Sequence, residues 1–338
     1  MKKKLITIIS LLIAAMMQTS FANDVINKNE KLKVLKKEFS NKLEIPIIMS
    51  SFKDVIPAHP EGFSKKGWFT NDHSFVEDKN GKLHWFGINN PYPPKGKRLY
   101  RYHPYLGHMS TSTPLKKWTR HKWAIDESKG TEYVGAPAVV WHDKEQKYVM
   151  VVETWLKGKR RLEVCWSKNL MDWQRTYKPI LPNKLWYTTR DPQIIKKSDG
   201  NYWIILASTG AEGKNGSQVI RLETKDFKKF SDPKEIFNLE DNAKATYLES
   251  PFIVYRPKTK LWYLFFTYAH RKYAETFVIV SKNPDKFELK NTLATLFSHA
   301  AEIFSYKGKT YISTCGPEDR HSRNTQATAL AELEWIKP

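Results

Sequence analysis

The most informative part of the sequence is Thr188-Thr189-Arg190-Asp191-Pro192-Gln193-Ile194-Ile195, followed by Asp199-Gly200-Asn201-Tyr202-Trp203-Ile204-Ile205-Leu206. The first stretch predicts a carboxylate at the start of a strand over residues 193–196, and the second predicts an apolar, aromatic strand over residues 202–207. An Asp-Gly pair between two such runs is a strong signal of a β-hairpin. We therefore expect a hairpin whose turn is Asp199-Gly200.

The same unit recurs along the chain. Each copy begins with a small or acidic residue, followed by two further residues, two apolar residues, a turn and an aromatic-rich strand. Five copies are found, and they begin at Asp72, Ala136, Asp191, Ser250 and Ala300. Five units of three or four antiparallel strands predict an all-β fold, a five-bladed β-propeller with a short N-terminal extension.

Two further features agree with a propeller. Aromatic residues follow the third strands of four copies, and we expect them to pack between blades; they are Trp118, Trp173, Phe230 and Phe287. A strand near Ile45, ahead of the first copy, could pair with the last blade and close the ring. Closure would leave few exposed strand edges.

The start of the chain has the pattern of a secretory signal peptide. Three lysines (residues 2–4) precede an apolar run over residues 5–17, and Ser20-Phe21-Ala22 forms a small-x-small cleavage site. The alternative, an uncleaved membrane anchor, is disfavoured because the apolar run is short for a bilayer span. We expect residues 1–22 to be a signal peptide, 23–66 an extension with a short helix and strand, and 67–338 the propeller. The mature protein would then be secreted or periplasmic, in a bacterium.

The chain is strongly basic, with a formal net charge of +21. Such a surface could attract nucleic acid, anionic lipid or an acidic polysaccharide. The lysines are scattered and no nucleic-acid motif accompanies them, so a solvated basic surface is favoured and no nucleic-acid partner is expected. The two cysteines, Cys165 and Cys315, fall in non-neighbouring units, and we expect free thiols and no metal bound to them. We expect a monomer without stable membrane insertion.

Three acidic residues stand at the starts of units one, three and four: Asp72, Asp191 and Glu249. In a propeller the innermost strands surround a central channel, so these residues are expected to meet. Burial and like charge would raise at least one pKa. A protonated and an ionised carboxyl group on either side of a glycosidic bond are what glycoside hydrolysis requires. The alternative for any single Asp is a residue that caps a turn.

Three motifs resemble those of the five-bladed propeller glycoside hydrolases, families 43 and 62 and families 32 and 68. Trp68-Phe69-Thr70-Asn71-Asp72 resembles the Trp-x-Asn-Asp element of family 32, with one extra residue and with His73-Ser74 in place of Pro-Asn. Arg190-Asp191-Pro192 is similar to the Arg-Asp-Pro motif of families 32 and 68, and Glu249-Ser250-Pro251 stands between the Glu-Cys-Pro of family 32 and the Glu-Gly-Pro of family 43. The resemblance covers roughly residues 68–335.

The resemblance implies a role for each residue of the three motifs. Asp72 would be the nucleophile of a retaining enzyme or the base of an inverting one, and Glu249 the general acid. Asp191 would stabilise the transition state or tune the pKa of the acid, and Arg190 would help to hold the sugar. The implied substrate is an oligo- or polysaccharide with a furanosidic linkage, fructofuranosidase- or arabinofuranosidase-like. A non-catalytic carbohydrate-binding propeller and a glycoside phosphorylase are the alternatives.

Four further residues are predicted to contact the substrate. Asn71 and His73 flank Asp72, and Trp186, ahead of the Asp191 motif in an expected loop, could stack on a sugar face. His299 precedes unit five, where a histidine of family 43 approaches a central ion or water cluster, so a calcium ion near His299 is possible by resemblance. The alternative is an ordinary surface or core histidine. No other cofactor or metal is expected.

Overall fold

The computed structural model describes residues 30–156, 159–181, 186–211, 217–239, 248–268, 272–316 and 327–338. The expected signal peptide, residues 1–22, lies outside the described residues. The chain divides into two compact units, Met1–Ile45 with Lys337–Pro338, and Pro46–Ile336. In the first unit, residues 30–38 are helical. Among the described residues, no helix has the length and apolar character needed to cross a membrane.

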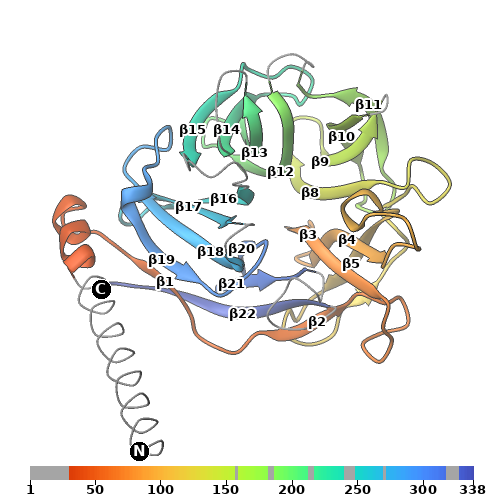
Figure 1. The fold of residues 1–338 in the computed structure, drawn as a ribbon, viewed down its shortest axis with the longest axis horizontal. Helices are drawn as coiled ribbons and strands as arrows, with labels where there is room; N and C mark the ends of the chain where they lie inside the picture. Colours follow the sequence, from red (N-terminus) through yellow and green to blue (C-terminus); the bar gives the residue numbers. More distant parts are fainter. Residues whose placement is uncertain are drawn as a thin grey trace, which may run out of the picture. The chain divides into compact units, whose positions relative to one another are not determined.

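The second unit is a five-bladed β-propeller, as predicted (Figure 1). Its first blade contains β3 (Trp68–Glu77), β4 (Leu83–Pro91) and β5 (Tyr105–Thr111), with the short β6 (Thr119–Arg120) and β7 (Ile125–Asp126) both paired to β5. A 3-10 turn, η1 (Leu99–Arg101), precedes β5. The second blade contains β8 (Val134–His142), β9 (Lys147–Leu156), β10 (Lys159–Ser167) and β11 (Gln174–Pro179).

The third blade contains the hairpin predicted from the sequence. It consists of β12 (Trp186–Lys196), β13 (Tyr202–Ala211), β14 (Ser217–Thr224) and β15 (Lys234–Leu239). Gly200 has φ +81° in the turn, a conformation that glycine adopts without steric cost. The expectation that Trp186 lies in a loop is wrong for the backbone, because β12 begins at this residue and runs through the Asp191 motif.

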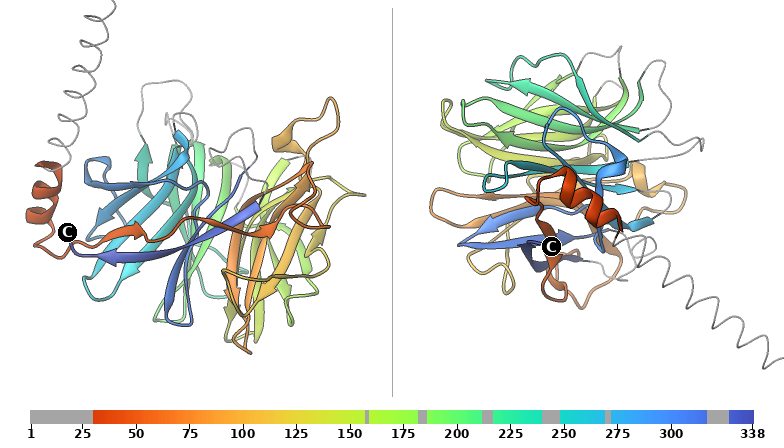
Figure 2. Two further views of the ribbon diagram at one scale, coloured as in Figure 1. Left: turned by 90° about the horizontal axis from the view of Figure 1, so that it is seen from below. Right: turned by 90° about the vertical axis from the view of Figure 1, so that its left-hand side faces the viewer.

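The last two blades complete the ring. The fourth contains β16 (Leu248–Arg256), β17 (Leu261–Tyr268), β18 (Lys272–Ser281) and β19 (Thr292–Leu296), with the 3-10 turn η2 (Leu289–Asn291) before β19. The fifth contains β20 (Ile303–Tyr306), β21 (Lys309–Thr314) and β22 (Ala327–Ile336), and both β1 (Ile45–Ile48) and β2 (Lys53–Pro57) pair with β22. Figures 1 and 2 show these early strands alongside β22.

Strands from an early and a late part of the chain therefore share one blade. The predicted pairing of the strand near Ile45 with the last blade is confirmed. The sequence interpretation placed residues 45–57 in an N-terminal extension, whereas in the structure they supply two strands of blade five. Hydrogen-bonded pairing of β2 with β22 joins residues almost 280 positions apart, for example Lys53 with Leu330.

Apolar clusters between neighbouring blades form the core. The four aromatic residues predicted to lie between blades do so. Trp118 packs in the cluster that joins blades five and one, and Trp173 in the cluster of blades one and two. Phe230 belongs to the cluster of blades two and three, and Phe287 to that of blades three and four. This packing fixes the angles between blades and hence the positions of their inner strands.

The inner strands share one irregularity. The pairing register shifts between Thr70 and His73 in β3, between Gly135 and Ala138 in β8, between Arg190 and Gln193 in β12, and between Glu249 and Phe252 in β16. Two residues thus oppose one at each site, which defines a β-bulge, and bulges commonly re-aim side chains beside active sites. The conformation is left-handed at Ala136, Asp191, Ser250 and Ala300, with φ between +40° and +55°. This conformation costs free energy for residues other than glycine, and such backbone strain is concentrated at functional sites.

Candidate active site

The four bulges, together with the segment before β20 of blade five, bring side chains from all five blades to one place. A cavity of about 10 Å³ between the inner strands is lined by Asp72, His73, Ala136, Pro137, Asp191, Pro192, Ser250, Pro251, Ala300 and Glu302. Two of the three predicted acidic residues, Asp72 and Asp191, face this cavity directly. The third, Glu249, precedes Ser250 on β16 and reaches the group through Arg190.

Ser250 links the first two carboxylates. Its hydroxyl donates a hydrogen bond to Asp72 Oδ1 at 3.0 Å, and its backbone N–H donates to Asp191 Oδ2 at 2.9 Å. The left-handed backbone at Ser250 accompanies these two contacts, one from its side chain and one from its main chain. One residue of blade four thus holds carboxylates from blades one and three.

Arg190 links the second and third carboxylates. Its Nη1 donates to Glu249 Oε1 at 2.9 Å and lies 3.5 Å from Asp191 Oδ2. Its Nη2 donates to the carbonyl oxygen of Leu248 at 3.2 Å. The predicted trio therefore forms one connected chain from Asp72 through Ser250, Asp191 and Arg190 to Glu249.

The electrostatic environment raises the pKa values of two of these groups. Burial, together with the negative charges of Asp191 and Glu249, holds the pKa of Asp72 well above its usual value. Burial, with contributions from Glu153 and Glu249, raises the pKa of Asp191 to about 6, although Arg190 and the Ser250 N–H oppose the rise. The expectation that at least one pKa is raised is confirmed, and burial is the largest cause.

Two acidic residues near the centre were not anticipated. Glu302 lines the cavity, and burial together with the charge of Asp72 raises its pKa well above the usual value. Glu153 is buried on β9, opposite Gly135 of β8, and its charge raises the pKa values of Asp72 and Asp191. A glutamate inside the apolar run Val151-Val152-Glu153 was the signal available in the sequence.

Glu153 is held by two partners. Tyr133 donates its hydroxyl to Glu153 Oε2 at 2.5 Å, and Arg160 of β10 forms an ion pair with the same oxygen. Glycine at position 135 leaves room on the inner strand for this group. The site thus contains five carboxylates and two arginines; its members are Asp72, Glu153, Arg160, Arg190, Asp191, Glu249 and Glu302.

The residues predicted beside Asp72 have different places. Asn71 Nδ2 donates to Asp72 Oδ2 at 3.3 Å, so Asn71 supports this carboxylate. His73 is buried and lines the cavity, with its Nε2 2.7 Å from Ser313 Oγ of blade five. Burial lowers the pKa of His73 to about 3, which keeps the imidazole neutral. The Trp186 side chain lies outside the described residues.

His299 is fully buried at the start of blade five. Its backbone N–H donates to Thr314 Oγ1 at 3.1 Å, and its carbonyl oxygen accepts the N–H of Cys315. His299 is not among the residues that line the central cavity. A calcium ion or a water cluster near His299 stays a prediction.

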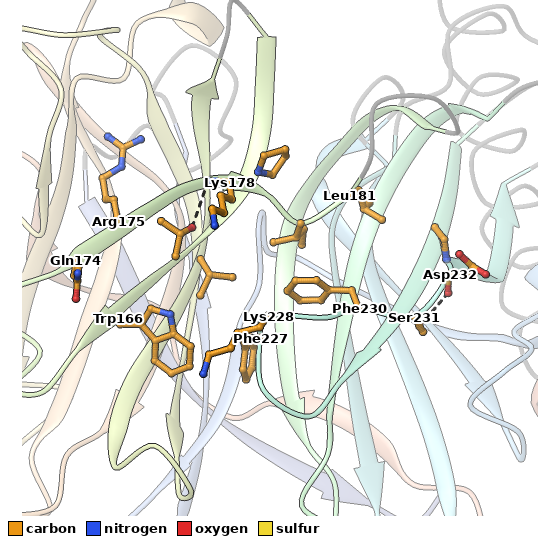
Figure 3. A pocket seen from close by; sticks show the side chains of 15 residues that line it. Trp166, Gln174, Arg175, Lys178, Leu181, Phe227, Lys228, Phe230, Ser231 and Asp232 are labelled. Atoms are coloured by element: carbon orange, nitrogen blue, oxygen red, sulfur yellow. Dashed lines mark hydrogen bonds between the residues drawn. The ribbon is translucent and has the colours of Figure 1, made fainter.

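A larger cavity lies elsewhere, between blades two and three. It has a volume of about 630 Å³, and Figure 3 shows Trp166, Phe227 and Phe230 on its walls, with Lys178 and Lys228 at its edges. None of the predicted site residues lines it. Both apolar and charged side chains line this cavity, whereas the predicted acidic residues gather at the narrower central cavity.

Comparisons with known proteins agree with the propeller fold. The family described as "Glycosyl hydrolases family 32 N-terminal domain" matches residues 63–313. No curated protein matches the chain. A thermostable family-43 glycoside hydrolase has a similar structure, with 14% identity over 79% of this chain and 89% of that chain, and a TM-score of 0.61.

Two further solved structures share the fold. RS223-Beta-xylosidase is 16% identical, covering 85% of this chain and 96% of its own, with a TM-score of 0.63. An endo-arabinase from Bacteroides thetaiotaomicron is 17% identical, covering 86% and 98%, with a TM-score of 0.58. At such identities the likeness shows the fold alone, and the family match carries the biochemical information.

Proposed function

The chain belongs to the glycosyl hydrolase family 32 N-terminal domain family, and from this premise we propose that it cleaves a furanosidic linkage of an oligo- or polysaccharide. It is a glycoside hydrolase on a five-bladed propeller. The observation that carries the proposal is the connected chain from Asp72 to Glu249 through Ser250, Asp191 and Arg190. One of the solved structures with this fold is a beta-xylosidase/alpha-arabinofuranosidase, and we propose to test an arabinofuranoside beside a fructofuranoside.

The three carboxylates have distinct roles in the proposed reaction. Asp72 attacks the anomeric carbon in a retaining mechanism, or takes a proton from the attacking water in an inverting one. Glu249 gives its proton to the leaving oxygen, so that the glycosidic bond breaks with a neutral leaving group. Asp191 stays outside the bond-making step, holds sugar hydroxyl groups and stabilises the developing positive charge on the sugar.

Arg190 imposes a condition on this mechanism. Its Nη1 donates to Glu249 Oε1, and an arginine beside a carboxylate favours the ionised form of the carboxylate. Glu249 must carry a proton to act as the acid. In the proposal, the sugar therefore takes over the Arg190 donors as it enters, which frees Glu249 to bind a proton and couples substrate binding to activation of the acid.

We also propose that the protein acts outside the cytoplasm. The lysine-rich start, the apolar run over residues 5–17 and the Ser20-Phe21-Ala22 site support export with cleavage after residue 22. The protein would then meet its polysaccharide in the periplasm or the medium, as a monomer. The N-terminal sequence of the mature secreted protein tests this assignment.

The decisive experiment compares wild type with Glu249→Gln on natural and aryl furanosides and pyranosides. We expect the variant to lose about 10² to 10⁴-fold in kcat/KM on natural substrates, because the leaving oxygen is no longer protonated. The loss should be smaller on 4-nitrophenyl glycosides, whose leaving group needs little protonation. Glu145→Gln is the matched control, since Glu145 forms a surface ion pair with Lys228 and should retain full activity.

Three outcomes contradict the proposal. Equal activity of Glu249→Gln and wild type would remove Glu249 from the mechanism. Sugar binding by wild type without turnover on the panel would indicate a non-catalytic carbohydrate-binding propeller. Turnover that depends on added orthophosphate and yields a sugar phosphate would indicate a phosphorylase.

A further inference from the structure

Three histidines gather on blade one, outside the central site. His84 lies on β4, His108 on β5, and His121 directly after β6. One ring nitrogen of each lies within 4.8 Å of one ring nitrogen of each of the others. His84 and His108 are buried, and His121 is half-buried. None of the three lines the central cavity.

Strand register explains why these rings meet. In the pairing of β4 with β5, His84 is opposite Ser110 and Phe86 is opposite His108. Side chains two apart share a face of a sheet, so His84 and His108 are diagonal neighbours. The backbone N–H of His121 donates to the carbonyl oxygen of His108, which brings the third ring beside them.

The ring nitrogens of the cluster lie close to one another and to a carboxylate. His84 Nδ1 and His108 Nε2 point at each other at 2.8 Å. The other nitrogen of His84, Nε2, lies 3.4 Å from Asp78 Oδ2. A ligating histidine commonly donates its second ring N–H to a carboxylate, which fixes the tautomer and orients the ring.

Asp78 is itself held firmly in place. Its Oδ1 accepts the backbone N–H groups of Asn80 and Lys82, at 2.9 and 2.8 Å, in the turn between β3 and β4. The ring of His108 is also held by a neighbour, because Phe86 stacks on it with ring centroids 4.3 Å apart. His121 Nε2 lies 2.7 Å from Ser110 Oγ, so each of the three imidazoles is oriented by a neighbour before any ion binds.

We propose that His84, His108 and His121 form a binding site for one divalent transition-metal ion of the Zn²⁺ type, with the carboxylate of Asp78 orienting His84. Three imidazoles with an open fourth position are a known donor set for such ions. Three nitrogens bound to a tetrahedral ion at 2.0–2.1 Å lie roughly 3.3 Å apart. His84 and His108 separate by about 0.5 Å to accept it, and His121, the most exposed, turns inward.

The site differs in function from the acidic centre. It joins β4 and β5 to the segment after β6, where only two residue pairs connect β6 to β5. An ion bound there would stabilise the attachment of β6 and the segment after it to β5. A ligand that binds only the folded state raises the unfolding temperature with its concentration. The competing arrangement is a hydrogen bond between neutral His84 and His108 rings without an ion.

The test uses the untagged full-length mature chain, freed of metal with EDTA and dialysed. Co²⁺ is titrated while its visible absorption is followed, and Zn²⁺ is then added to displace it. We expect one Co²⁺ per chain, bands typical of tetrahedral nitrogen coordination, displacement by Zn²⁺, and a higher unfolding temperature with Zn²⁺.

Two variants locate the ion. His121→Gln should weaken Zn²⁺ binding at least about tenfold, and Asp78→Asn by about 10 to 100-fold. His59→Gln is the matched control, because His59 is also half-buried but lies outside the cluster, and it should bind as wild type. Circular dichroism verifies that each variant is folded. Failure of wild type to bind one ion, or equal affinity of His121→Gln and wild type, would overturn the proposal.

Discussion

Blades two and three build the same bulge and fill it differently. In β8 the bulge is Ala136-Pro137, with φ +40° at Ala136, and in β12 it is Asp191-Pro192, with φ +55° at Asp191. Ala136 brings only a methyl group to the central cavity, whereas Asp191 brings a carboxylate whose pKa is raised to about 6. The same bulged backbone can thus carry either an inert or an acidic side chain.

The residues before the two bulges extend the comparison. In blade two, Gly135 on the inner strand faces Glu153 on the second strand, and in blade three Arg190 faces Ala207. A large charged side chain on one strand is thus paired with a small residue on the other. Blade two thus supplies a negative charge from its second strand, and blade three supplies a positive charge from its inner strand. The charge of Glu153 contributes to raising the pKa of Arg190.

Among the tests of this comparison, the largest effect is expected from making blade three resemble blade two. Asp191→Ala gives Ala-Pro at the third bulge, the composition already accommodated at Ala136-Pro137. We expect kcat/KM to fall by about 10² to 10³-fold, because a preorganised charge near the reacting sugar is lost. Steady-state kinetics on the substrate identified by the panel, with circular dichroism to verify folding, measures this effect.

Asp191→Asn is the companion variant that separates charge from hydrogen bonding. It can still accept the N–H of Ser250 through its amide oxygen but carries no charge. If charge carries the effect, both variants lose activity to a similar extent. Wild-type kcat/KM in the Asn variant would restrict Asp191 to positioning Ser250, and wild-type kcat/KM in both would exclude it from catalysis.

A smaller effect is expected at the link between blades. Ser250→Ala removes the hydroxyl that donates to Asp72 Oδ1 but keeps the N–H that donates to Asp191. A donor to a carboxylate favours the ionised form, so its loss raises the pKa of Asp72 further. Because Asp72 must be ionised to attack or to act as base, the acidic limb of kcat/KM should move to higher pH, by about one unit.

The control for this shift is Ser128→Ala. The Ser128 hydroxyl also donates to a carboxylate, Asp126 Oδ1 at 2.6 Å, but this pair lies at an exposed position on blade one. Its removal should leave the pH profile unchanged. A Ser250→Ala profile that moves to lower pH, or does not move, would contradict the assignment of the acidic limb to Asp72.

Repetition explains what the sequence could predict. Asp72, Asp191 and Glu249 stand at or directly beside the bulges of three inner strands, at three different bulge positions, so a propeller prediction brings them near one another without fixing their contacts. Glu153 could not be predicted in this way because it lies on a second strand, where the repeat pattern marks no acidic position. His84 and His108 are 24 residues apart, and only the β4–β5 register makes them diagonal neighbours.

The smallest expected effect tests the strain shared by the bulges. Ala136 has φ +40°, where an L-residue pays about 1–2 kcal/mol and glycine pays almost nothing. Glycine also makes the unfolded chain more flexible, at a cost of about 0.4–1 kcal/mol. Ala136→Gly should therefore raise the free energy of unfolding by about 0.5–1 kcal/mol, measured by urea denaturation.

Ala138→Gly on the same strand is the matched control. Ala138 is buried like Ala136, but its φ is not positive, so glycine relieves no strain there and should lower the free energy of unfolding by about 0.5–1 kcal/mol. Opposite signs for the two variants would show that the bulge stores strain even in a blade without an acidic residue. Equal destabilisation by the two variants would mean that the backbone at Ala136 is not strained. The left-handed conformation would then follow from the geometry of the blade, with no free energy spent to form the site.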